Sequence, residues 1–347
     1  MARISEVLTA KAVATRWEAS AKLRKPYLFE GLFPARKKLG LELSWIKGAR
    51  KAPVAMQLSS FDAKVIPLSR GTFEKTSAEM PFFKNSLNVN EKQRQELHMI
   101  NESYQEAIKA VVSEIFDDAL TLLEASDLVL EQFRASAVVN GAIAYESNGQ
   151  TVNVDYGYED WQKVTLGTND KWTSTATADP IAKLGELADL VAEKGGVRPS
   201  YVVMNTATLS ALKKVEAVKD AIYVLGEGKI TPSTKDVKNH IQDEAQLTVL
   251  VYDKGYMDEA SGAFTKFVPD GKAVLIPEGD LGNTWFGTTP EESDLMTAKS
   301  ASVSIVDTGK AVTTYHGDDP VVSTTKVSMI ALPSFEQAGS CVTITAY

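Results

Sequence analysis

The sequence predicts an α+β fold organised around one long amphipathic helix. Apolar residues recur at helical spacing from Leu97 to Leu122. Patterns typical of β-strands precede this helix in residues 52–88 and dominate residues 311–347. Between them, residues 179–215 alternate helical and strand patterns. With 347 residues, the chain has room for about two domains.

Composition limits the classes of protein to which the chain can belong. Hydrophobic residues make up 44% and charged residues 24%, as in ordinary globular proteins. No stretch approaches the roughly 18 apolar residues of a membrane span, and the basic N-terminus lacks the apolar core of a signal peptide. The single cysteine, Cys341, excludes an intrachain disulfide and a cysteine-based metal cluster. Stability must therefore come from packing or from assembly.

The first fifty residues form a basic arm. Residues 1–51 carry twelve lysines or arginines and four glutamates, although the whole chain has a net charge of -8. We expect a short helix within residues 4–20 and irregular structure around Phe33 and Pro34. The arm could bind nucleic acid or an acidic partner, and a solvated or self-binding arm explains the charge equally well. The acidic remainder argues against a dedicated nucleic-acid binder.

Residues 52–88 are expected to form a long two-stranded excursion. Apolar residues alternate with polar or small ones at Val54, Met56 and Leu58. Pro67 indicates an edge strand, and Arg70-Gly71 indicates a bend. Because an isolated two-stranded ribbon is marginal in water, it needs a partner surface. It either folds back on its own domain or lies across an adjacent subunit.

The long helix is the strongest local signal. Asn90 is a suitable cap, with Gln93 in the capping-box position. Its apolar stripe runs for some thirty residues, roughly 45 Å at 1.5 Å per residue. A second helical stretch, residues 127–139, continues it past Ser126. We expect such a helix to lie along a sheet as a spine.

The second half of the chain predicts a hairpin and an α/β segment. Asn148-Gly149 suits a tight hairpin turn, since both residues must accept positive φ. A helix should begin near Asp179-Pro180 and end at Gly195-Gly196, followed by a buried strand at residues 201–204 and another helix. From residue 267 a strand leads into an expected loop, residues 281–295. This loop carries Trp285 and Phe286 and could grip a ligand or a neighbouring copy.

Motifs for catalysis are missing from the sequence. It contains no GxGxxG after a strand, no phosphate-binding GxxxxGK[ST], no GxSxG elbow and no HExxH helix. His316 with Asp318 and Asp319 is better explained as a polar turn than as a metal site. Cys341 is expected to be a small buried hydrophobe. The aromatic residues Tyr156, Tyr158, Trp161 and Trp172 lie among acidic and polar residues, and we expect them to pack in a core or an interface.

The order of elements resembles the major capsid protein of tailed bacteriophages, specifically the phage lambda-like branch (phage capsid E family). Three stretches between Leu32 and about Asp294 carry the resemblance. The stretch SSFDAKVIPLSRG is similar to the excursion loop of that branch, and RASAVVNGAIAYESNGQTVNVDYG to its spine-helix end and hairpin. The stretch GKAVLIPEGDLGNTWFGTTPEESD is similar to a late strand and loop of its axial domain. The specificity comes from their order.

The resemblance implies an HK97-like capsid fold with four parts. It assigns residues 1–50 to an N-terminal arm, 51–88 to an extended β-hairpin loop, 89–160 and 296–347 to a peripheral domain, and 161–295 to an axial domain. It also places residues 281–294 in a loop exposed to neighbouring subunits or to the capsid surface. The arm and the extended loop would be buried against other copies, because neither stabilises itself. Candidate contacts between subunits are Phe33, Trp45, Phe61, Arg70, Phe73, Phe82, Trp285 and Phe286.

The resemblance also implies the function. The chain would be a major capsid protein without enzymatic activity or cofactor, self-assembling into pentamers and hexamers of an icosahedral shell around phage double-stranded DNA. It would be located in the virion after assembly in the host cytoplasm, with no membrane contact. Its partners would be itself, a portal, a decoration protein where one exists, and a separate scaffolding protein or a scaffolding segment removed earlier. An acidic shell would touch packaged DNA only weakly and non-specifically.

Two alternatives remain open on sequence. Within the same architecture, the chain could form a compartment shell of the encapsulin type, which genomic neighbours would distinguish. From another class, it could be an α/β enzyme or a sugar-binding module that uses the Trp285 loop. Ligand binding or turnover by a monomer would favour that second alternative.

Overall fold

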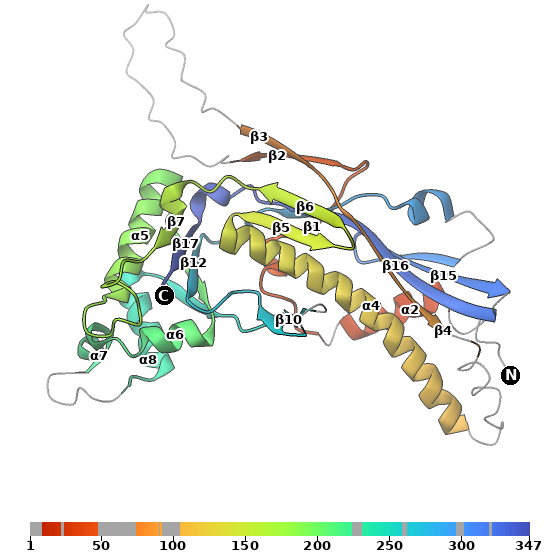
Figure 1. Ribbon diagram of the computed structural model, residues 1–347, viewed down its shortest axis with the longest axis horizontal. Helices are drawn as coiled ribbons and strands as arrows, with labels where there is room; N and C mark the ends of the chain where they lie inside the picture. Colours follow the sequence, from red (N-terminus) through yellow and green to blue (C-terminus); the bar gives the residue numbers. More distant parts are fainter. Residues whose placement is uncertain are drawn as a thin grey trace, which may run out of the picture. The chain divides into compact units, whose positions relative to one another are not determined.

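The computed structural model describes residues 9–21, 24–47, 74–89, 91, 105–223, 231–258, 262–295, 302–318 and 321–347. The chain divides into two compact units (Figure 1). Unit 1 comprises Met1–Leu43, Ala78–Phe133 and Asn283–Ser334, and unit 2 comprises Ser44–Ser77, Arg134–Gly282 and Phe335–Tyr347. These limits differ from the expected ones. Residues 283–295 lie in unit 1, and residues 134–160 and 335–347 lie in unit 2. The expected arm and extended loop, residues 1–50 and 51–88, are divided between the units after Leu43 and after Ser77.

Unit 1 contains a six-stranded sheet with β16 (Val321–Ser334) at its centre. Along one edge β16 pairs with β15 (Lys310–Asp318), which pairs with β14 (Ser302–Val306). Along its other edge it pairs with β4 (Phe82–Val89) and then with β13 (Asn283–Phe286), all antiparallel. A short parallel strand, β1 (Ala35–Lys37), completes the sheet beside β13.

The pairing of β13 corrects the expectation of a loop at residues 281–295. Trp285 and Phe286 lie in a strand between β1 and β16, opposite Leu332 and Ala331 of β16. A single turn of π-helix, η3 (Glu291–Leu295), follows. The glycines and prolines around these aromatic residues suggested a loop, but strand pairing with segments distant in the sequence decides the structure.

The long helix is continuous. Helix α4 spans Gln105–Asn140, which confirms that the helix continues past Ser126. The Ser126 hydroxyl donates to the backbone carbonyl of Leu123 at 2.6 Å, so this buried polar group is satisfied within the helix. Within unit 1, Leu130 of α4 packs with Phe286, Met329 and Ala331 of the sheet. The expected cap at Asn90 lies outside the described residues.

Unit 2 contains a five-stranded mixed sheet. Its strands lie in the order β7 (Lys163–Thr165), β17 (Val342–Thr345), β12 (Lys272–Ile276), β8 (Tyr201–Met204) and β9 (Thr248–Val251). The outer pairs β7–β17 and β8–β9 are parallel, and the inner pairs are antiparallel. The C-terminal strand β17 therefore belongs to this sheet, which explains why residues 335–347 fall in unit 2.

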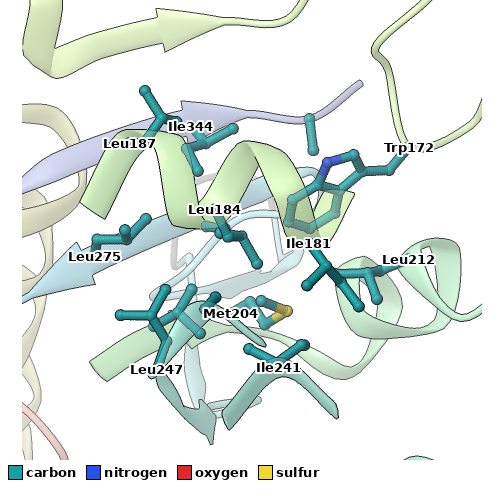
Figure 2. Packing of buried hydrophobic residues seen from close by; sticks show 14 of the residues in the cluster. Trp172, Ile181, Leu184, Leu187, Met204, Leu212, Ile241, Leu247, Leu275 and Ile344 are labelled. Atoms are coloured by element: carbon teal, nitrogen blue, oxygen red, sulfur yellow. The ribbon is translucent and has the colours of Figure 1, made fainter. Parts of the chain in front are cut away.

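Helices pack against that sheet and enclose its core. They are α5 (Pro180–Gly195), α6 (Thr206–Leu212), α7 (Glu216–Ile222) and α8 (Thr234–Ala245). Asp179 caps α5 by accepting from the Ala182 amide, and Gly196 ends it with a φ of 76°, as predicted. Figure 2 shows Leu184 and Leu187 of α5 with Met204 and Ile344 of the strands in one apolar cluster.

Two-stranded ribbons complete the fold. The hairpin β5 (Ala142–Ser147) and β6 (Gln150–Asp155) turns at Asn148 and Gly149, whose φ angles of 50° and 73° confirm the prediction. Unit 2 also carries the hairpin β10 (Gly255–Met257) and β11 (Phe264–Lys266). A third ribbon pairs β2 (Glu42–Lys47) with β3 (Glu74–Glu79). The rest of the expected excursion, residues 48–73, lies outside the described residues.

Candidate interaction surfaces

The N-terminal segment from residue 9 to residue 37, here called the strap, is part of the core of unit 1. Its helix α2 (Ala10–Ala21) buries one apolar face, formed by Ala10, Val13, Ala14 and Trp17. This face packs with Phe116 and Leu123 of α4 and with Val306, Val312 and Val327 of the sheet. The described strap is therefore buried within its own chain, whereas the arm was expected to be buried against other copies.

The second half of the strap is anchored as firmly as the first. Phe29 and Phe33 are fully buried, and the Phe29 amide donates to Glu131 Oε1 at 3.0 Å. The Phe33 carbonyl accepts from the Thr284 hydroxyl at 3.0 Å. Phe33 was a candidate contact between subunits, but its side chain is fully buried. It follows the short 3-10 turn η1 (Glu30–Leu32) and lies in the interior of unit 1.

Two further candidates are also interior side chains. Trp45 is buried in unit 2, with its ring 5.5 Å from that of Tyr156. Phe286 is buried in unit 1 beneath α4, because alternation along β13 places it on the same face as Ala331. The expectation that Trp45 and Phe286 contact a neighbouring subunit directly is therefore wrong, because both side chains pack within the chain.

The other candidates have different positions. Trp285 is partly buried, and its indole Nε1 donates to the Ser334 hydroxyl at 3.1 Å. Phe82, at the start of β4, is 45% exposed. Phe61, Arg70 and Phe73 lie outside the described residues.

Phe82 belongs to an exposed apolar group that we call the root patch, formed by Leu39, Leu41 and Phe82. Leu39 is 82% exposed and Leu41 is 46% exposed. Phe82 lies opposite Ile330 in the sheet, and Met80, two residues before it, donates its amide to the Leu41 carbonyl at 2.8 Å. Leu39 and Leu41 thus precede β2 along the chain, and Phe82 follows β3.

The root patch lies on the sheet face opposite α4. Met329 and Ala331 of β16 face α4, so the intervening Ile330 faces the other side. A Cβ built on Gly287 would lie 2.8 Å from Ile330 Cγ2 and 3.2 Å from the Gly40 carbonyl oxygen. The turn at residues 38–41 therefore lies close to Gly287 on this face, and a larger residue at position 287 would force Ile330 and the turn to shift.

The turn that carries Leu39 is fixed at both ends. Gly40 has a φ of 89°, a conformation that favours glycine. The Lys38 amide donates to the Phe286 carbonyl at 2.8 Å, and the Lys38 ammonium donates to the Glu42 carbonyl at 2.8 Å. Leu39 is therefore presented on an ordered turn. Leu39 was not among the predicted contact residues, although two leucines flanking a glycine next to a basic run were a visible signal in the sequence.

Charged residues surround the root patch. Arg36 Nε donates to Asn283 Oδ1 at 3.2 Å, and the Lys84 ammonium lies 5.8 Å from the centre of the Phe82 ring. Lys37 forms an ion pair with Glu292 of η3 at 2.5 Å. Lys84 therefore lies beside an apolar ring of the patch, and Arg36 and Lys37 precede Leu39 in the sequence.

Glu291 fixes η3 to the same face of the sheet. It accepts from the Lys326 ammonium at 2.6 Å and from the Ser328 hydroxyl at 2.9 Å. Burial by itself raises the pKa of this carboxyl, but the hydrogen bonds from Lys326, from its own backbone amide and from Ser328 outweigh burial, so the pKa is lowered. Glu291 therefore stays ionised and holds η3 in place.

Unit 2 presents a second exposed apolar pair. Met257 is 63% exposed and Phe264 is 57% exposed, and the two lie directly opposite each other in the β10–β11 hairpin. A Cβ on Gly255 would lie 2.8 Å from Phe264 Cζ, so the ring crosses above this glycine. At the base of the hairpin, the rings of Phe267 and Tyr252 stack with centres 6.0 Å apart.

The residues that were considered as catalytic, ligand-binding or metal-binding candidates pack or form hydrogen bonds within the chain. Cys341 is buried, and burial raises the pKa of its thiol. Tyr156, Tyr158 and Trp172 are buried, which confirms their predicted packing role. His316 Nδ1 lies 2.9 Å from the Ser323 hydroxyl, and Asp319 lies outside the described residues. Among the described residues, no three His, Cys, Asp or Glu side chains are grouped as metal ligands.

Comparisons with known proteins were made for the whole chain. A family model described as phage major capsid protein E matches residues 9–346. A search of curated proteins gives no significant match. Of the helices that the structure describes, none is both long and apolar enough to span a membrane.

Solved structures resemble the chain over nearly its full length at low sequence identity. A candidate capsid protein of a prophage from Escherichia coli CFT073 is 13% identical, with a TM-score of 0.64, and the match covers 98% of this chain and 99% of that chain. A phage-related protein from Bordetella bronchiseptica RB50 is 12% identical, with a TM-score of 0.54 and coverage of 100% and 98%. The capsid of cyanophage A-1(L) is 11% identical, with a TM-score of 0.51 and coverage of 91% of both chains.

Proposed function

Because the chain belongs to the family of phage major capsid protein E, it is a shell-forming major capsid protein of the virion, and we propose that its copies form pentamers and hexamers of an icosahedral shell around phage double-stranded DNA. The single observation that carries this conclusion is the family match over residues 9–346. The similar capsid structures confirm the predicted HK97-like fold. The family favours a phage shell over an encapsulin-type compartment.

Unit 1 corresponds best to the peripheral domain and unit 2 to the axial domain. Most of the long helix and the six-stranded sheet lie in unit 1, and the mixed sheet with its covering helices lies in unit 2. In this proposal β13 belongs to the peripheral domain, contrary to the expected limits. The end of α4, the β5–β6 hairpin and β17 belong to the axial domain, also contrary to those limits.

The root patch contacts a neighbouring copy in this proposal. Its three apolar side chains are exposed on an ordered turn and strand, and removing such surface from water favours association by about 25 cal/mol per Å². Phe82 carries over from the sequence analysis, and Leu39 and Leu41 join it. The remaining candidates for contact are Phe61, Arg70, Phe73 and Trp285. The buried residues Phe33, Trp45 and Phe286 pack within the chain and do not contact a neighbouring copy directly.

Other partners follow from the same proposal. A shell of this kind assembles in the host cytoplasm with a separate scaffolding protein and a portal, and it accepts a decoration protein where one is present. Contact with packaged DNA is weak and non-specific because the chain carries a net charge of -8. The chain works by packing against copies of itself and has no enzymatic activity. The enzyme and sugar-binding alternatives rested on a Trp285 loop, and β13 takes the place of that loop.

Electron microscopy of the purified protein, with and without a co-expressed candidate scaffold, tests the proposal. We expect closed polyhedral shells or capsomer-sized rings from the wild type. The triple variant Leu39→Ser/Leu41→Ser/Phe82→Ser should remain folded but lose most assembled particles. Leu87→Ser is the matched control, because Leu87 is similarly exposed on the same strand but points to the opposite face.

The outcomes separate the general proposal from the proposed contact. A wild type that stays monomeric with every scaffold would contradict the shell function. Shells from the triple variant at wild-type yield would contradict the role of the root patch and leave the family assignment intact.

A further inference from the structure

A cluster of charged side chains surrounds Trp17 where the strap crosses unit 1. Lys310, the first residue of β15, lies at its centre and is only 2% exposed. Its ammonium donates to Asp127 of α4 and to Asp307 Oδ2, the latter at 2.7 Å. One buried cation thus joins the long helix to the turn between β14 and β15.

The strap binds to the same two carboxylates. Trp17 Nε1 donates to both oxygens of Asp307 at 3.2 Å. Arg24 Nη1 donates to Asp127 Oδ2 at 3.2 Å. The Arg24 guanidinium also lies 3.6 Å from the centre of the Trp17 ring and the Lys310 ammonium 5.3 Å from it, so both cations interact with the indole ring.

The turn between β14 and β15 holds Asp307 in an unusual backbone conformation. Asp307 has a φ of 50°, in the left-handed region that aspartate tolerates better than most residues. Gly309, two residues later, approaches Phe286 so closely that a Cβ would lie 2.6 Å from Phe286 Cβ. The turn is therefore fixed on the sheet, and the Asp307 carboxylate has a defined position for both Trp17 and Lys310.

We propose that this cluster is a charge-dependent clasp that holds the strap on its own chain. Lys310 keeps the two carboxylates in the positions that Trp17 and Arg24 require. When this charge balance is lost, α2 and Arg24 separate from unit 1 while the sheet stays folded. The clasp operates within one chain, so it acts before any shell forms and goes beyond the proposed function.

The composition of α2 explains why charge decides its docking. Apart from Trp17, its buried face consists of Ala10, Val13 and Ala14, which are small and bury little apolar area. Without Lys310, Asp127 and Asp307 lose the buried cation that they share, and solvent screens part of this loss because their side chains are 17% and 40% exposed. The cluster therefore contributes more to holding α2 than its apolar contacts alone would suggest.

Hydrogen exchange measured by mass spectrometry on the unassembled full chain tests the clasp. In Lys310→Met, the amides of α2 should exchange about 100-fold faster than in the wild type, while peptides from β16 and α5 keep their protection. The matched control is Lys326→Met. Lys326 belongs to the same sheet and has its own carboxylate partner, Glu291 at 2.6 Å, and none of its interactions involves the strap. The control should leave exchange in α2 unchanged.

A compensated variant distinguishes charge from packing. Lys310→Met/Asp127→Asn/Asp307→Asn removes the central charges but keeps oxygen acceptors for Trp17 and Arg24. In this variant the amides of α2 should exchange at least about tenfold more slowly than in Lys310→Met. The proposal is wrong if α2 exchange in Lys310→Met stays within about twofold of wild type. It is also wrong if β16 loses protection together with α2, or if the compensated variant exchanges as fast as Lys310→Met.

Discussion

The strap and the root patch belong to the same unit and to the first ninety residues, but the chain covers the first and exposes the second. Both were expected to need a neighbouring copy. Phe29 and Phe33 of the strap are fully buried within unit 1, whereas Leu39, only six residues after Phe33, is the most exposed large apolar side chain described. The border between self-contained structure and free surface therefore lies between residues 33 and 39.

This difference shows that a segment without a core of its own need not be completed by another copy. The strap finds its partners in α4, β13 and the β14–β15 turn, all of them distant in sequence. The root patch faces away from α4, on the side of the sheet where the turn at residues 38–41 and η3 lie. We expect substitutions in the strap to change stability, and substitutions in the root patch to change assembly.

The largest effect should come from Phe33→Ala. The ring is fully buried, and truncation of a buried phenylalanine costs about 3–5 kcal/mol, including the cavity that remains. Chemical denaturation of the unassembled protein should show this loss. Because a chain with two compact units need not unfold in a single transition, hydrogen exchange of β13 should confirm that the loss is in unit 1. An unchanged free energy of unfolding would mean that the strap is dispensable, and the comparison would fail.

Glu291→Gln should lower the stability of unit 1 by about 2 kcal/mol at neutral pH, since a charged hydrogen bond to Lys326 is weakened. The lowered pKa of Glu291 predicts the pH dependence. Its contribution is fully present above its ordinary pKa of 4.5 and is lost as the pH falls through the lower folded value. Thermal unfolding between about pH 5 and pH 2 should therefore destabilise the wild type more steeply than the variant. Parallel pH profiles would contradict this assignment.

Gly287→Ala should have a smaller effect, about 1–2 kcal/mol. The new Cβ would meet Ile330 Cγ2 at 2.8 Å and Met80 Cε at 3.1 Å, and these flexible side chains can adjust partly. The turn that carries Leu39 must also shift, since the Gly40 carbonyl lies 3.2 Å away. Shell yield should therefore fall more than the stability loss explains. The control is Gly185→Ala within α5, where a Cβ meets open space, so this variant should gain up to about 1 kcal/mol from helix propensity and leave shell yield unchanged.

Local chemistry made several elements predictable from the sequence. Asp179, Gly196 and the Asn148-Gly149 turn define their ends through caps and positive φ, so α5 and the β5–β6 hairpin agree with expectation. The periodicity of α4 is equally local. These features depend on neighbours within a few residues.

Long-range pairing was not predictable in the same way. Trp285 lies in a strand because β1 and β16 pair with β13 on either side, and no local pattern indicates those partners. Phe33 and Trp45 appeared suitable for contact with a neighbour because large aromatic residues are common in interfaces and in cores alike. Burial distinguishes these two uses, and burial depends on the complete fold. For the root patch, only the basic run before Leu39 was a local signal.

The smallest expected effect on folding is the most informative one. Leu39→Ser should change the free energy of unfolding by no more than about 0.5 kcal/mol, because an 82% exposed side chain loses almost no burial when it is replaced. Denaturation of the unassembled subunit measures this directly, with Phe33→Ala as the contrasting variant six residues earlier. A decrease of about 2 kcal/mol in the free energy of unfolding would mean that Leu39 packs within its own chain in solution. Its exposure would then no longer support a contact, and the distinction between a covered strap and a free root patch would disappear.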